Sequence, residues 1–157
     1  VALPEAVSLE LLAKEIGAVD GVAVEHIRPV AAERPDSATA VLHLAATIAE
    51  SPPAERLGVL VGGLLAALDA DWAVALSAGE LVEQRGAPPD LGWLLAFLEG
   101  SEHLDQVASA AHAPSDVLWA RLPRSGIVLA TGRAHRDVHE RERLRITTLA
   151  RVVDHLL

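Results

Sequence analysis

The sequence predicts an α+β fold, with a four-stranded antiparallel sheet and packed helices. Two pairs of short, apolar-rich runs are joined by turn residues, which predicts β-hairpins over residues 71–85 and 117–132. Around these hairpins, apolar residues recur at helical spacing and favour amphipathic helices. The apolar share of the 157 residues is 51%, so a substantial core can be buried.

Residues 1–30 predict a strand–helix–strand unit. Residues 1–3 have strand composition, and Ser8 is suited to cap a helix that ends near Gly17. Residues 22–28 have strand composition again. A unit this short cannot bury a core alone, so we expect it to pair with a further segment or with another chain.

Residues 31–52 predict a linker and a helix, and residues 53–157 predict the main domain. The main domain begins with the helix at residues 57–68, whose apolar stripe is the most regular in the chain. Each glycine inside a helix costs about 1 kcal/mol relative to alanine, so we expect the glycines of this helix to let another helix approach closely. The stripe consists of Leu57, Leu60, Val61, Leu64 and Leu68, and the glycines are Gly58, Gly62 and Gly63.

The middle of the main domain predicts a hairpin followed by two helices. Strands at residues 71–77 and 80–85 flank a short Ala-Gly turn. Asp90 then caps a helix that we expect Gly100 to end, and a second short helix follows at residues 102–111. The inward residues expected for the first of these helices are Leu91, Leu94, Leu95 and Leu98.

The closing segment predicts strands at residues 117–122 and 127–132 and a helix at residues 138–157. This helix and the helix at residues 57–68 both carry wide apolar stripes, so we expect them to lie side by side on one face of the sheet. A face this wide can also serve a second molecule. We therefore expect a homodimer, formed through the terminal helices, the strands of residues 1–30, or both. If the chain is an interaction module, this dimer should dissociate when Leu149 or Val153 becomes charged.

Composition excludes several classes of function. The net charge of −9 argues against nucleic acid and anionic membranes as partners. The absence of cysteine excludes disulfides, thiolate metal sites and cysteine nucleophiles, and it is compatible with the cytoplasmic location that we expect. The chain has no methionine and begins at Val1, so we expect residues to precede it.

Charge is unevenly distributed along the chain. From Arg121 onward there are eight arginines and four acidic residues, a local charge of +4, whereas the preceding residues carry −13. An arginine-rich end can hold an anion or an acidic partner. The favoured alternative is a solvated, self-paired helix start with the helically spaced pairs Asp137/Arg141, Glu140/Arg143 and Glu142/Arg145.

Two stretches of the chain resemble known regulatory families. Residues 8–16, Ser-Leu-Glu-Leu-Leu-Ala-Lys-Glu-Ile, and residues 21–24, Gly-Val-Ala-Val, resemble the C-terminal half of an ACT domain, an amino-acid-binding βαββαβ module. Residues 64–76, 126–130 and 147–153 resemble a reduced GAF-like domain. Together they are similar to regulatory proteins of actinobacteria with an ACT domain. The resemblance implies amino-acid binding, and it assigns no ligand residue.

Candidate chemical sites are few. His135, Asp137 and His139 could hold zinc, although their place before the last helix favours Asp137 and His139 as capping residues. A ligand cleft could be lined by Trp93, His103, His112 and Trp119. The alternative is that these histidines are at the surface and these tryptophans are in the core.

Signatures of catalysis are absent from the sequence. No serine lies in a Gly-x-Ser-x-Gly elbow, and neither a P-loop nor a Gly-x-Gly-x-x-Gly motif occurs. We therefore predict a non-enzymatic regulatory or sensory module without a cofactor, which binds a small metabolite such as an amino acid and signals through dimerisation. The alternative is an interaction or structural domain with no small-molecule pocket.

Overall fold

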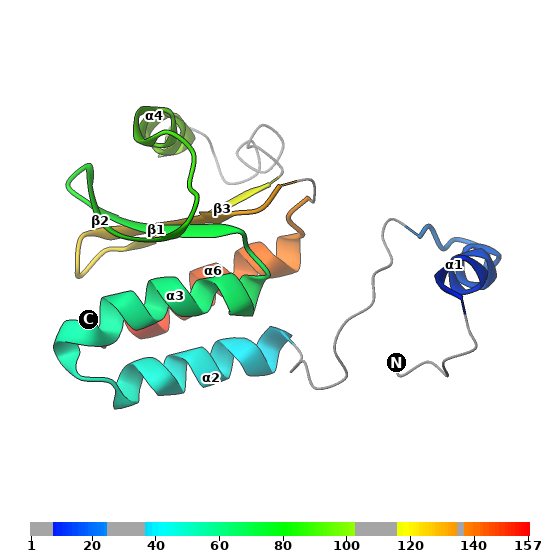
Figure 1. Cartoon of the computed structure of the whole chain (residues 1–157), viewed down its shortest axis with the longest axis horizontal. Coiled ribbons are helices and arrows are strands. Elements are labelled where there is room, and N and C mark those ends of the chain that lie inside the picture. The colour runs from blue at the N-terminus through cyan, green and yellow to red at the C-terminus, as the bar shows by residue number, and fades with distance from the viewer. Residues whose placement is uncertain (1–7, 25–36, 103–115, 135–136) are drawn as a thin grey trace. The chain divides into compact units, whose positions relative to one another are not determined.

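A computed structural model describes residues 8–24, 37–102, 116–134 and 137–157 (Figure 1). The chain divides into two compact units, Val1–Pro35 and Asp36–Leu157. The strand expected at residues 1–3 lies outside the described residues, and so does the helix expected at residues 102–111 apart from its first residue.

The first unit contains one described helix, α1 (Leu9–Gly17). Its cap is the one predicted, because Ser8 Oγ accepts a hydrogen bond from the Leu11 amide at 3.2 Å. α1 buries none of its residues. The strand expected at residues 22–28 is not formed over residues 22–24, and its remainder lies outside the described residues.

The second unit is built on a four-stranded antiparallel sheet, as predicted. Its strands are β1 (Trp72–Ser77), β2 (Glu80–Gly86), β3 (Val117–Leu122) and β4 (Ile127–Gly132). Their order across the sheet is β2-β1-β4-β3, and each neighbouring pair is antiparallel. The two hairpins therefore meet along β1 and β4, which leaves β2 and β3 at the edges.

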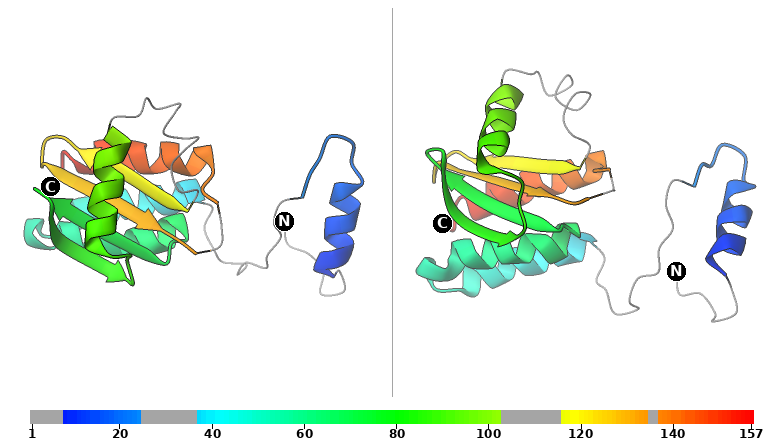
Figure 2. Two further views of the ribbon diagram at one scale, coloured as in Figure 1. Left: turned by 90° about the horizontal axis from the view of Figure 1, so that it is seen from above. Right: turned by 45° about the horizontal axis from the view of Figure 1, so that its top comes forward.

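Helices cover both faces of the sheet (Figures 1 and 2). α3 (Arg56–Leu68), which follows the short 3₁₀ helix η1 (Pro53–Glu55), and α6 (Glu140–Val153) cover one face together. α2 (Ser37–Glu50) packs on the outside of α3 and α6, and α4 (Leu91–Glu102) crosses the opposite face. The expectation that the helices at residues 57–68 and 138–157 share one face is thus confirmed.

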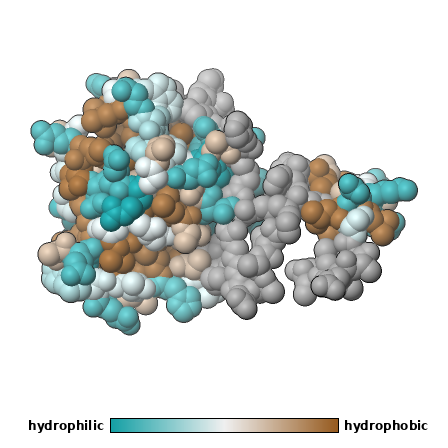
Figure 3. Space-filling view, viewed as in Figure 1, coloured by the Kyte–Doolittle hydropathy of each residue, from teal (hydrophilic) through white to brown (hydrophobic). Residues whose placement is uncertain are grey.

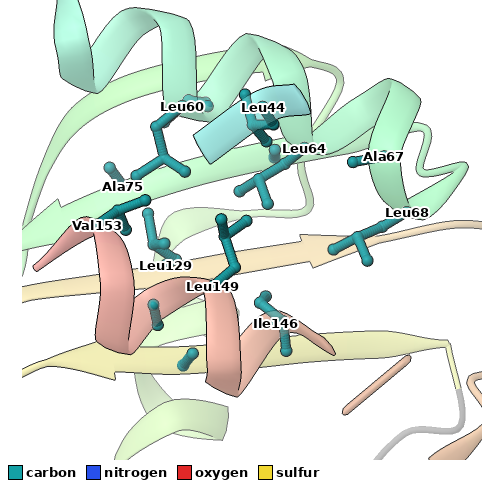
Figure 4. Packing of buried hydrophobic residues seen from close by; sticks show 14 of the residues in the cluster. Leu44, Leu60, Leu64, Ala67, Leu68, Ala75, Leu129, Ile146, Leu149 and Val153 are labelled. Atoms are coloured by element: carbon teal, nitrogen blue, oxygen red, sulfur yellow. The ribbon is translucent and has the colours of Figure 1, made fainter. Parts of the chain in front are cut away.

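The main core lies between the sheet and the layer of α3 and α6 (Figure 4). Leu149 and Val153 are 2% and 0% exposed, so both belong to the core of their own chain. The expectation that they also meet a second molecule is therefore wrong, because the apolar stripe of α6 is covered by the sheet and by α2 of the same chain. The labelled members of this cluster are Leu44, Leu60, Leu64, Ala67, Leu68, Ala75, Leu129, Ile146, Leu149 and Val153.

A second core lies between α4 and the other face of the sheet. Leu94 and Leu98 are buried there as predicted, whereas Leu91 is 37% exposed and does not point inward. The helix continues past Gly100 to Glu102, so the predicted stop is wrong. In this last turn the buried Ser101 donates its hydroxyl to the Phe97 carbonyl at 2.7 Å.

The close approach of another helix that was predicted for the glycines of α3 is confirmed at Gly63 and not at Gly58 or Gly62. A Cβ atom on Gly63 would lie 2.2 Å from Cδ1 of Leu44, so Gly63 lets α2 pack tightly against α3. Gly58 and Gly62 instead lie beneath the side chain of Arg85 on β2. Figure 3 shows apolar atoms exposed over α2 and α3, with a hydrophilic cluster where β2 meets α3.

Candidate functional site

The two tryptophans predicted to line a ligand cleft occupy different surroundings. Trp93 on α4 is 45% exposed, and its ring stacks on Phe97 with centroids 5.6 Å apart. Trp119 on β3 is half-buried against the second core. His103 and His112 lie outside the described residues. The cleft formed by these four residues therefore stays a prediction.

The residues predicted as a possible metal site are used in the entry to α6. His139 is the residue that caps the helix, and its amide donates to Glu142 Oε2 at 2.9 Å, as in a capping box. Asp137 is exposed, and its backbone carbonyl accepts from Arg133 Nη2 at 2.7 Å. His135 lies outside the described residues, within which no three potential metal ligands come together.

A buried arginine organises the same region, and sequence reasoning missed it. Arg133, directly after β4, is 5% exposed. Its guanidinium binds the Glu142 carboxylate through two hydrogen bonds of 2.8 and 2.7 Å, and Nη1 also donates to the Leu68 carbonyl at 3.0 Å. One side chain thus joins the C-terminal end of α3, the loop before α6 at Asp137 and the first turn of α6.

The environment of Glu142 favours its charged form. Burial raises its pKa, but the hydrogen bonds from Arg133 and from the His139 amide, together with the charge of Arg133, lower it by more. The net result is a pKa below the ordinary value of 4.5. Glu142 is therefore a charged structural anchor at the start of α6.

Acid is expected to weaken this anchor. Because the pKa of Glu142 is lower in the folded chain than in the unfolded chain, its contribution to stability is present above about pH 4.5 and is lost as the pH falls through the lowered pKa. We expect Glu142→Gln to be less stable than the parent chain at pH 7, with the difference shrinking in acid. Urea unfolding at a series of pH values measures the stability difference at pH 7 and its decrease in acid. A difference that stays constant down to pH 3 would contradict the assignment.

A buried carboxylate, that of Asp154, holds the far end of α6. Asp154 is 6% exposed and accepts hydrogen bonds from the amides of Arg124 and Ser125 at 2.9 and 3.0 Å and from the Ser125 hydroxyl at 2.9 Å. Burial raises its pKa, and these three donors and the charge of Arg124 lower it by more. The turn between β3 and β4 is thereby fixed to the C-terminal end of α6.

The outer face of α6 differs from the sequence prediction. The expected pair Glu142/Arg145 is wrong, because Glu142 binds Arg133 on the inner side of the helix. Within the described part of the chain, none of Arg141, Arg145 and Arg151 forms an ion pair. We define the outer face of α6 as Arg141, Leu144, Arg145, Thr148, Arg151 and Val152, which share one side of the helix.

A shallow depression lies beside the Arg133 network. Asp116, Thr131 and Val138 contribute to its lining, and it has no room for a water-sized molecule. The depression is therefore smaller than the pockets of roughly 300–1,000 Å³ that typically hold small molecules.

Comparison with known proteins adds no assignment. No protein-family model, curated protein or solved structure matches this chain. The resemblance to ACT and GAF-like domains therefore stays a prediction. The described helices are all too short or too polar to cross a bilayer.

The sequence contained a partial signal for the burial of Arg133, but none for its partner. Arg133 follows a predicted strand with a buried pattern, and a charge at the end of such a strand calls for a partner. Nothing in the helical spacing showed that the partner would be Glu142, nine residues further along the chain. The pairing depends on where the loop before α6 places the helix.

Proposed function

We propose that this chain is a non-enzymatic regulatory module whose output is protein association, beginning with the formation of a homodimer. The observation that carries the proposal is an exposed apolar helix face on α2. Leu42 in the middle of α2 is 70% exposed, the largest exposure among the large apolar side chains that the structure describes. Together with the exposed alanines on the same side of the helix, Leu42 forms a continuous apolar patch, and such patches mark contacts with a second molecule.

The face around Leu42 is suited to a second copy of the same chain. Its neighbours along the same side of the helix are small and exposed, which allows two helices to approach closely. Within α2 only His43 and Glu50 can ionise, so a two-fold pairing of this face opposes few like charges. The face comprises Ala38, Leu42, Ala46 and Ala49.

The packing around the sheet supports association over a ligand held beneath α3. Both faces of β1 are covered by packed side chains, one face by each core. Ala73, Val74 and Ala75 are accordingly 0, 1 and 0% exposed. A metabolite pocket on the sheet would need some of these side chains to be withdrawn. A dimer needs no such change.

The dimer can be tested by sedimentation equilibrium over a concentration series. We expect a dimer at high concentration and expect Leu42→Glu to shift it to monomer, because the substitution places two carboxylates at the centre of the contact. The matched control is Leu144→Glu, a similarly exposed leucine on α6, which should leave the dimer unchanged. A chain that stays monomeric at every concentration would contradict the dimer.

Metabolite sensing is the alternative that the same protein can reveal. A thermal-shift panel of amino acids detects a ligand because binding to the native state raises stability by about 2.7 kcal/mol at a hundredfold excess over Kd. We expect no shift for the 157-residue chain. A reproducible shift with one amino acid would replace association by ligand sensing as the primary function.

A further inference from the structure

We propose that the outer face of α6 is a docking surface for an acidic amphipathic helix of a partner protein. This inference rests on the proposed function only in taking the output of the module to be protein association. It concerns a different helix from the proposed dimer contact and a different kind of partner.

The apolar part of this face is a ridge. Leu144, Thr148 and Val152 are spaced four residues apart and therefore form one row along the helix. Leu144 is 67% exposed and Val152 is 49% exposed, with the small Thr148 between them. Rows at this spacing are the ridges that fit the grooves of a second helix, and the threonine leaves a notch for an apolar side chain.

Arginines border this ridge. Arg141 and Arg145 lie toward one side of it and Arg151 toward the other. The acidic residues of α6 lie in its first turn, and one of them, Glu142, is committed to the buried Arg133. The exposed face is therefore both apolar and cationic, and its complement is an apolar stripe flanked by carboxylates.

The arginines of the outer face of α6 also favour one kind of partner over the others. A second copy of the chain placed on this face by two-fold symmetry would bring arginine against arginine, which is unfavourable. An extended anionic surface such as a membrane would also face acidic parts of the protein. Because the net charge of the protein is −9, such a surface would be repelled. A single helix about 10–12 Å wide meets only the local face, and more distant charges are screened over about 8 Å at physiological salt.

The test measures peptide binding to the full 157-residue chain by fluorescence anisotropy. The probe is a labelled peptide of about 18 residues, long enough to form a helix, with leucines at i, i+3, i+4 and i+7 flanked by glutamates. A second peptide has lysine in place of every glutamate. We expect only the acidic peptide to bind, with an affinity that falls as salt is added.

Matched variants locate the contact. Arg145→Glu with Arg151→Glu should weaken acidic-peptide binding by about tenfold or more. Arg85→Glu, a charge reversal on β2 at the opposite edge of the sheet, should leave it unchanged. Leu144→Ser should weaken binding, whereas Leu42→Ser on α2 should not. Circular dichroism checks that each variant is folded.

Several results would overturn the proposal. Equal binding of the two peptides would show that the arginines do not select the partner, and undiminished binding to the double arginine variant would place the contact elsewhere. Binding of the parent chain to phosphatidylserine vesicles, without binding of the acidic peptide, would assign the face to a membrane. A dimer that Leu144→Ser dissociates would assign it to a second copy.

Failure here is distinguishable from failure of the proposed dimer. Sedimentation of Leu42→Glu reports on the dimer and leaves the α6 face intact, whereas the double arginine variant changes the α6 face and leaves α2 intact. A monomer that binds the acidic peptide would contradict the dimer alone. A chain that forms the dimer but binds neither peptide would contradict the docking surface alone.

Discussion

Substituting Leu149 with glutamate is expected to unfold the second unit and not merely to separate a dimer. Leu149 is 2% exposed in the core that α6 shares with the sheet, and a carboxylate there has no partner. Replacing a buried leucine by alanine already costs about 2–5 kcal/mol. The total stability of such a domain is about 5–15 kcal/mol, so an added buried charge removes most or all of it.

Urea unfolding followed by tryptophan fluorescence measures this effect. Trp72 lies in the second core on the other face of the sheet, so it reports on the whole unit. Leu149→Ala should unfold cooperatively at lower urea, and Leu149→Glu should show no cooperative transition. Leu144→Glu on the exposed side of α6 should stay within about 0.5 kcal/mol of the parent chain. A folded, monomeric Leu149→Glu chain would mean that this side chain lies at an interface.

Substituting Arg133 with methionine is expected to be the second most damaging of these changes. It leaves the Glu142 carboxylate and the carbonyls of Leu68 and Asp137 without the donors that the guanidinium provides. Removing one partner of a fully buried ion pair costs about 3–5 kcal/mol. Because the Glu142 carboxylate is only half-buried, we expect a loss at or below the lower end of this range. The midpoint of urea unfolding at pH 7 should fall accordingly.

The double substitution Arg133→Met and Glu142→Leu provides the control for Arg133. Removing both charges together avoids the buried unpaired carboxylate, so the double variant should be more stable than Arg133→Met alone. The difference between the observed double effect and the sum of the single effects gives the coupling energy. Additive effects would show that the two side chains do not depend on each other.

Local pattern was sufficient for most of the second unit. The strands at residues 117–122 and 127–132 were predicted with the bounds that the structure has. Alternating and continuous apolar runs are properties of a few neighbouring residues, and the turn residues between them specify a hairpin without reference to the rest of the chain. The glycines of α3 likewise indicated close packing, although not which element would approach each one.

The candidate site was far less predictable. Helical spacing around Glu142 suggested Arg145 as its partner, and the structure pairs it with Arg133 instead. Spacing alone cannot rank these partners, because the burial that favours Arg133 over Arg145 arises only when the chain is folded. The same limit applied to Leu149 and Val153, whose burial depends on how much of the α6 stripe the sheet and α2 cover.

The sequence by itself determined the α+β class, the two hairpins, the amphipathic helices and their caps at Ser8 and Asp90, because these follow from short-range sterics and hydrogen bonding. The tertiary structure decided which charges are paired, which apolar side chains are left in solvent, and hence which faces of α2 and α6 are available to partners. Those properties depend on contacts between elements far apart in the chain, such as Arg124 with Asp154. Burial and charge pairing are therefore outcomes of packing that no local pattern contains.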